Sequence, residues 1–151
     1  MGTALKLDTS AGLYNQDFYV WTMEQADLLR RHKPDWMDWE NVAEELEFMG
    51  KKDRRELVSR MTILLIHLTK WYWQPEKRSP GWLGTIEEQW EQIDLILNDS
   101  PSLRSFIQCS FQGAWGRVVK KAAKEPSLPL STFSETCPWP IEDILGEWMP
   151  E

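Results

Sequence analysis

The residues best suited to chemistry are two glutamates and one histidine on neighbouring predicted helices. Glu44 and Glu45 lie in a helical stretch that we expect to end at Gly50, and His67 lies in the most apolar stretch of the chain. A short turn at Gly50 would make the two helices antiparallel neighbours and bring Glu45 towards His67. A carboxylate beside an imidazole can serve as a general base or as part of a divalent-metal site. The same pair can be structural, because a buried histidine needs a hydrogen-bond partner, and we favour that interpretation.

No motif supports a metal ion or a cofactor. The His-Glu-x-x-His pattern of zinc enzymes and the paired Glu-x-x-His pattern of di-iron bundles are both absent from the sequence. There is no glycine-rich phosphate loop and no Gly-x-Ser-x-Gly nucleophile motif. Cys109 and Cys137 do not form a Cys-x-x-Cys pair, which fits reduced thiols in a cytoplasmic protein. We therefore predict no metal and no cofactor.

A second group of side chains combines tryptophans with cations around the predicted connector 74–84. Aromatic rings interleaved with Lys and Arg can stack on bases or hold an anionic ligand. The alternative, which we favour, is that the rings close the end of a helical bundle while the cations stay solvated at its rim. The candidate ligand- or partner-binding residues of this group are Lys70, Trp71, Arg78 and Trp82.

A third group is purely basic and lies at the end of a later predicted helix, at Arg117, Lys120, Lys121 and Lys124. Cations in the last turn of a helix are stabilised by the helix dipole. We interpret this group as the solvated face of that helix.

The elements that carry these residues are predicted to be helices throughout. Apolar residues recur at helical spacing in five stretches, and prolines break up the chain beyond Pro126. The third stretch is the most apolar, and we expect it to be the central helix of the fold. Its predicted buried stripe is Leu57, Met61, Leu64, Leu65, Leu68 and Tyr72.

The predicted fold is all-α: a single-domain bundle of about five main helices with an extended, Pro-rich C-terminal segment. Residues 1–12 are expected to be a loose tail and residues 13–151 the domain. Thr85 and Glu88 fit a capping box, which places the start of the fourth helix after the connector. The expected helices cover residues 14–33, 36–49, 51–73 and 85–97. A fifth is expected to begin at Pro101, after Ser100 as its N-cap, with an apolar face that runs from Leu103 to Ala122.

Charge and length limit the possible partners. The chain has 151 residues, a net charge of −7 and ten tryptophans. An acidic protein does not attract phosphates or an anionic membrane surface, so we expect no nucleic-acid partner and no membrane partner. The longest apolar run, from Ile63 to Leu68, is far shorter than the roughly 20 residues that span a bilayer. We expect a cytoplasmic protein.

Several blocks of the sequence occur in a characteristic order and spacing: Tyr14-Asn-Gln-Asp17-Phe-Tyr-Val-Trp21, Asp38-Trp-Glu-Asn-Val-Ala-Glu-Glu45-Leu-Glu-Phe-Met-Gly50, Leu64-Leu-Ile-His67-Leu-Thr-Lys70-Trp71, Gln74-Pro75 with Arg78-Ser79, Trp82 with Thr85-Ile86, Ser100-Pro-Ser-Leu103, and Leu128-Pro-Leu-Ser-Thr-Phe133 with Cys137-Pro138. Together they resemble the family of domains of unknown function numbered twenty-nine. The resemblance implies a helical bundle in a bacterial cytosolic protein, mostly cyanobacterial, and it implies no activity. Two positions depart from the family pattern: Phe133-Ser134 stands where Phe-Pro is usual, and Gln89-Trp90 where Gln-Arg is usual.

These features lead to three hypotheses about function. The first is a non-enzymatic protein-interaction or regulatory module that holds an unknown protein partner in Trp-rich grooves, because Trp and Tyr dominate binding hot spots. The alternative is a hydrolase or nuclease-like enzyme that uses Glu45 and His67. A third is a bundle that binds an anion through Lys70, Arg78 and helix N-termini. The oligomeric state stays open.

Overall fold

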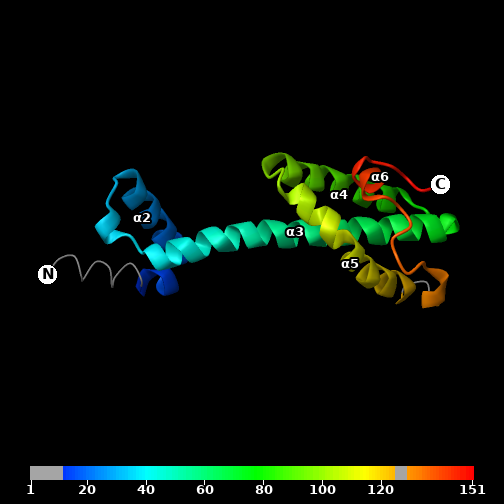
Figure 1. Cartoon of the computed structure of the whole chain (residues 1–151), viewed down its shortest axis with the longest axis horizontal. Coiled ribbons are helices and arrows are strands. Elements are labelled where there is room, and N and C mark those ends of the chain that lie inside the picture. Colours follow the sequence, from blue (N-terminus) through cyan, green and yellow to red (C-terminus); the bar gives the residue numbers. More distant parts are fainter. Residues whose placement is uncertain (1–11, 125–128) are drawn as a thin grey trace. The chain divides into compact units, whose positions relative to one another are not determined.

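The computed structural model describes residues 12–124 and 129–151, and every regular element in these residues is a helix (Figure 1). The all-α prediction is therefore confirmed. Residues 12–16 are helical; the rest of the predicted tail, residues 1–11, lies outside the described residues. Three single-turn 3₁₀ helices lie at Pro34–Trp36, Pro75–Lys77 and Leu130–Thr132. The α-helices are α2 (Phe18–Arg30), α3 (Trp39–Trp73), α4 (Pro80–Asp99), α5 (Leu103–Lys124) and α6 (Ile141–Leu145).

Residue contacts divide the chain into two compact units, Met1–Lys51 and Lys52–Glu151. The boundary falls within the residue range of α3. Each unit has its own buried side chains. The single domain expected over residues 13–151 stays a prediction.

The first unit is built around α2 and a polar network next to it. The Asp17 side chain caps α2 by accepting a hydrogen bond from the Val20 N–H at 3.0 Å. The helix ends at Arg30, before the predicted stop at Pro34, and His32 takes the left-handed conformation with φ 53°. The buried indole of Trp21 donates from Nε1 to the Asp38 carboxylate at 3.2 Å.

The turn predicted at Gly50 is wrong, because α3 continues through this position as one helix. A turn there would have used glycine in the left-handed region, and no glycine of the described residues has a positive φ. No proline interrupts the range from Trp39 to Trp73, and the Lys, Arg and Glu residues of 51–56 are good helix formers. Their propensity offsets the roughly 1 kcal/mol that a glycine costs inside a helix. The predicted second and third helices are therefore one.

In the second unit, α3, α4, α5 and the C-terminal residues share one apolar core. The expected central stripe of α3 is confirmed from Leu57 to Leu68, but Tyr72 is 45% exposed and does not belong to it. The α4 and α5 helices contribute apolar residues at helical spacing. The buried core residues are Leu57, Met61, Leu64, Leu65, Leu68, Ile86, Trp90, Ile93, Leu97, Ile107, Phe111, Trp115, Val118, Trp139, Ile141 and Ile144.

Helix α4 begins at Pro80, earlier than the predicted start at Thr85. Ser79 is the N-cap and accepts a hydrogen bond from the Trp82 N–H at 3.2 Å, with Pro80 in the first helical position. The Thr85 hydroxyl does not cap a helix; it donates to the Gly81 carbonyl one turn back. The long predicted connector is therefore only the short segment around Pro75–Lys77.

Residues 129–151, which we call the C-terminal strap, are fastened to the core by tryptophans. The Trp90 indole of α4 donates to the Ile144 carbonyl at 2.7 Å. The Trp115 indole of α5 donates to the Ser134 carbonyl at 3.0 Å. Trp139 of the strap is 7% exposed, and its ring lies 5.8–6.0 Å from the rings of four aromatic neighbours: Tyr72, Trp73, Trp115 and Trp148. The tryptophan excess therefore has a structural use: all three indoles bury large apolar rings, and those of Trp90 and Trp115 also satisfy a backbone carbonyl with their N–H.

Candidate functional site

The predicted approach of Glu45 to His67 required a turn at Gly50, and α3 continues through that position without a turn. Glu45 belongs to the first unit, where its carboxylate accepts a hydrogen bond from the Tyr14 hydroxyl at 2.5 Å. This bond and the nearby carboxylates raise the pKa of Tyr14 to about 12. Glu44 is exposed and, with Tyr14 and Glu45, lines a polar pocket of about 260 Å³.

His67 belongs to the second unit and is half-buried. Its Nδ1 lies 2.9 Å from the Ile63 carbonyl one turn back on the same helix. A carbonyl oxygen only accepts, so Nδ1 carries the proton in this bond. No cluster of three or more His, Cys, Asp or Glu side chains able to hold a metal ion occurs in the part of the chain that the structure describes.

The four candidate residues near the end of α3 form two cation–aromatic pairs. The Arg78 guanidinium lies 4.9 Å from the centre of the Trp71 ring, and its Nε donates to the Trp71 carbonyl at 2.9 Å. The Lys70 ammonium lies 5.8 Å from the centre of the Trp82 ring, and Lys70 is 9% exposed. Both pairs join the end of α3 to the start of α4. Their geometry fits the structural interpretation, in which the aromatic rings and cations hold the helix connection together.

A different site, a groove of about 390 Å³ on the second unit, is lined by α3 and α5. The lining residues of α3 recur at steps of four, as a single helical face requires. On α5, Arg117 and Lys121 follow Phe106 by eleven and fifteen residues, which again places the three on one helical face. We call this site the basic groove; it is lined by Arg54, Arg55, Val58, Ser59, Thr62, Ile63, Phe106, Arg117 and Lys121.

Four cations line the basic groove: Arg54, Arg55, Arg117 and Lys121. No Asp or Glu is among its described lining residues. The ion pairs found within residues 12–124 and 129–151 use none of the four cations. Arg54 is held over the Phe106 ring, with 5.0 Å between its guanidinium carbon and the ring centre. The groove is therefore a concentration of positive charge around apolar side chains.

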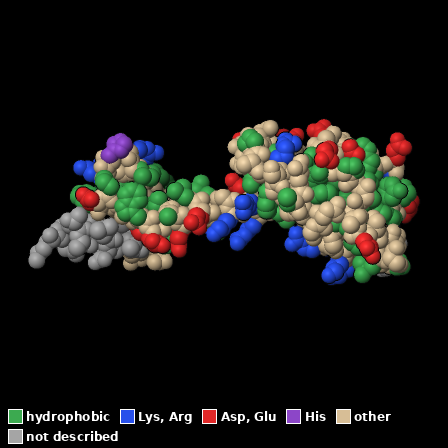
Figure 2. Space-filling view, in the orientation of Figure 1, with side chains coloured by type: hydrophobic (Ala, Val, Ile, Leu, Met, Phe, Trp, Pro, Cys, Tyr) green, Lys and Arg blue, Asp and Glu red, His purple; other side chains and the backbone are tan. Residues whose placement is uncertain are grey.

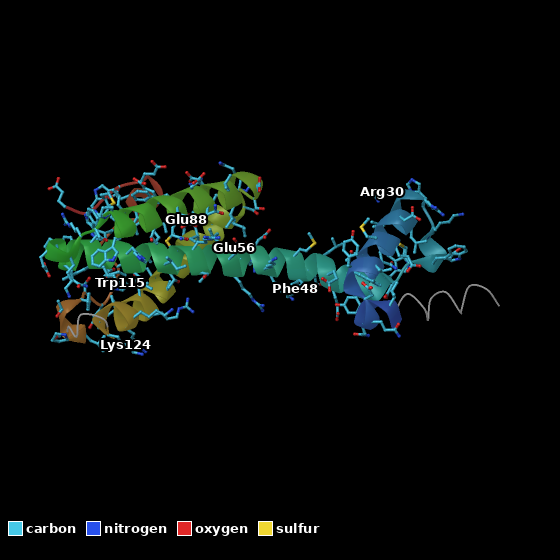
Figure 3. All side chains as sticks on the ribbon, turned by 180° about the vertical axis from the view of Figure 1, so that it is seen from behind. Arg30, Phe48, Glu56, Glu88, Trp115 and Lys124 are labelled. Carbon is cyan, nitrogen blue, oxygen red and sulfur yellow. The ribbon has the colours of Figure 1, made fainter. Side chains whose placement is uncertain are left out.

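Charge is segregated between the elements of the second unit. The α4 sequence, Pro80–Asp99, contains five acids and no Lys or Arg, and residues 129–151 likewise contain five acids and no cation. The α5 sequence, Leu103–Lys124, contains five cations and no acid. In Figure 3, Glu88 and Lys124 lie on opposite sides of this unit. Figure 2 shows most of the acidic side chains of this unit towards its upper edge and basic side chains at its lower edge, with one basic group near the top and one acidic group at the lower right.

The sequence pattern identified two cations of the basic groove, Arg117 and Lys121, but they were interpreted as part of a solvated helix face. Arg117 and Lys121 are exposed, as expected for a solvated helix face. What was missed is that this face lies beside the Arg54 face of α3, which supplies two further cations. The available signal was a helix with five cations, no acid and an aromatic residue, Phe106, on the same face as Arg117 and Lys121.

The fold and this site define an all-helical protein with a cationic groove on one unit. Among the described residues, no helix is both long enough and apolar enough to cross a membrane. The chain belongs to the family described as a domain of unknown function, DUF29, whose model matches residues 13–149. The match covers parts of both units. Searches of curated proteins and of solved structures found no match.

The departure from the family pattern at position 90 has a structural meaning in this chain. Trp90 is buried and its indole holds the strap at Ile144. The neighbouring Gln89 is also buried, and its amide oxygen lies 3.4 Å from a guanidinium nitrogen of Arg60. This pair of positions serves packing here, so it supplies no cation for an anion site.

Proposed function

We propose that this protein is a non-enzymatic module that binds another protein, and that the basic groove is its binding site. The observation that supports this proposal is a groove with four cations and no acid, in a chain whose net charge is −7. Cations gathered without acids among them leave an attractive potential for an anionic surface. An interaction module with a regulatory role in the cytoplasm fits the two free thiols, Cys109 and Cys137, because reducing compartments keep cysteines unpaired.

The proposal differs in one respect from the Trp-rich grooves that the sequence suggested. Trp90, Trp115 and Trp139 are buried and hold the strap, so they are not offered to a partner. The Trp71 and Trp82 rings pair with cations of the same unit. No observation on the described residues favours Glu45 and His67 as a joint acid–base or metal site for a hydrolase or nuclease.

A selection from a random-peptide display library on the immobilised full chain tests this function. The groove variant, Arg117→Glu/Lys121→Glu, reverses two exposed cations of the basic groove. The control variant, Lys120→Glu/Lys124→Glu, makes the same change of charge on the same helix at exposed positions that do not line the groove. Both variants replace cations by another good helix former at the same i, i+4 spacing.

We expect the wild type and the control variant to enrich the same peptides, and the groove variant to lose them. The proposal is contradicted if no peptides are enriched, or if the groove variant enriches the same set as the wild type. Thermal unfolding of each variant establishes that the charge reversals leave the fold intact.

A further inference from the structure

We propose that the segment recognised by the basic groove is an acidic peptide with an apolar side chain among its carboxylates. This inference rests on the proposed function and adds the chemistry of the partner to it. Three properties of the groove support it: the type of its cations, the apolar side chains between them, and its length along α3.

The cations favour carboxylates. Three of the four are arginines, Arg54, Arg55 and Arg117. The planar guanidinium donates two parallel hydrogen bonds to one carboxylate, whereas an ammonium acts as a point charge. A row of Asp or Glu side chains is therefore a matched ligand. The carboxylates nearest in sequence, Asp53 and Glu56, do not line the groove, and that of Glu56 lies 3.4 Å from Arg60 on the same helix.

The apolar part of the groove favours a ligand that is not purely charged. Val58, Ile63 and Phe106 line the space between the cations, and all three are partly buried. The Thr62 hydroxyl donates to the Val58 carbonyl at 2.8 Å, so its proton is already used within the helix. An apolar side chain placed there gains free energy by leaving water. The partner segment is expected to carry at least one Leu, Ile or Phe among its acids.

The length of the groove limits the size of the segment. The lining residues of α3 run from Arg54 to Ile63, nine residue steps, or about 14 Å at 1.5 Å per residue. An extended peptide covers this distance with about four residues. A helical peptide covers it with two to three turns, or about nine residues.

Nucleic acid fits the groove less well than a peptide does. Single strands bind to aromatic rings on which successive bases stack. The groove contains one aromatic ring, Phe106, and the Arg54 guanidinium lies over it.

The test is the binding of fluorescent synthetic peptides to the full chain, followed by anisotropy. The probe is a peptide of about nine residues in which Glu alternates with Leu. Its comparison peptides replace every Glu by Gln, every Glu by Lys, or every Leu by Ala. A fluorescent oligodeoxythymidine of similar length serves as the nucleic-acid probe.

We expect the Glu–Leu peptide to bind more tightly than each comparison peptide. The groove variant should weaken its binding about 10- to 100-fold, because two attractions become repulsions, whereas the control variant should change it by about threefold or less. Binding should also weaken at about 1 M salt, where the screening length falls to about 3 Å.

Three results would overturn the inference. The first is equal affinity for the Glu and Gln peptides, and the second is equal loss of binding in the groove and control variants. The third is tighter binding of the oligonucleotide than of the acidic peptide. If the display selection enriches peptides that lack Asp and Glu and that the groove variant no longer binds, the acidic-peptide inference is refuted and the proposed function stands. An absence of groove-dependent peptides of any composition refutes the proposed function itself.

Discussion

Replacing Trp139 by Ala should remove the main anchor of the C-terminal strap. The Trp139 ring is 7% exposed and touches the rings of Tyr72, Trp73, Trp115 and Trp148 at centre distances of 5.8–6.0 Å. The substitution leaves a cavity the size of an indole where the strap meets α3 and α5. Buried Trp→Ala substitutions cost about 3–5 kcal/mol of unfolding free energy.

A cost of about 4 kcal/mol is a large part of the roughly 5–15 kcal/mol that stabilises a typical domain. With a urea dependence of about 2 kcal/mol per molar, the unfolding midpoint of the second unit should fall by about 2 M. The assay is urea unfolding followed by far-ultraviolet circular dichroism, because this signal reports helix content and does not depend on the removed fluorophore.

The matched control is Trp39→Ala, which removes the same side chain at a position that is 56% exposed in the first unit. The Trp39 indole donates to the Pro34 carbonyl at 3.0 Å near the surface, so we expect a loss of about 1 kcal/mol or less. If Trp139→Ala costs no more than Trp39→Ala, the strap is not anchored by its central tryptophan and the packing argument is refuted.

Three further predictions concern single contacts. Trp90→Phe keeps an aromatic side chain, smaller than the indole, but leaves the buried Ile144 carbonyl without its N–H donor. The unfolding free energy should fall by about 1–3 kcal/mol, and no loss would contradict this. Gly113→Ala should raise stability by about 0.5–1 kcal/mol, because a Cβ there meets no atom within 4 Å and alanine favours the helix; a lower urea midpoint would contradict this. In a spectroscopic pH titration, one tyrosine should ionise near pH 12, and this step should vanish in Tyr14→Phe and move towards pH 10 in Glu45→Gln. The neutral phenol is the hydrogen-bond donor, so its stabilising contribution is present below pH 10 and is lost as the pH rises through about 12.

Residue spacing and proline positions predicted those features of the fold that depend on residues close together in the sequence. The spacing from Leu57 to Leu68 identified the buried face of α3, because that periodicity directly reflects which side chains face the core. The prolines beyond α5 correctly suggested the absence of another long helix. The break at Gly50 was wrong because one glycine was given more weight than the helix-forming residues after it.

The start of α4 shows how two valid signals compete. Ser79-Pro80 and Thr85 with Glu88 are both acceptable helix beginnings, and the glycines at 81 and 84 favoured the later one. The structure uses the earlier one, with Ser79 as the cap. Neither local sequence shows that the Arg78 guanidinium will lie over the Trp71 ring, a contact that holds the residue before the Ser79 cap against the end of α3.

The basic groove could not be predicted from one segment because its two walls come from different helices. Arg54 on α3 and Arg117 on α5 lie 63 positions apart in the sequence, and each wall alone resembles an ordinary solvated face. Only the packing of α3 against α5 places the four cations around the apolar side chains of Val58, Ile63 and Phe106.

The most direct test of the proposed binding site is to observe the arginine side chains while the acidic peptide binds. Nuclear magnetic resonance of the ¹⁵N-labelled full chain resolves the guanidinium Nε–H groups during titration with the Glu–Leu peptide. We predict saturable shifts of the Arg54, Arg55 and Arg117 signals, with the Arg30 and Arg31 signals unchanged. Shifts confined to arginines outside the groove, or no saturable shift of the three groove arginines, would contradict the account.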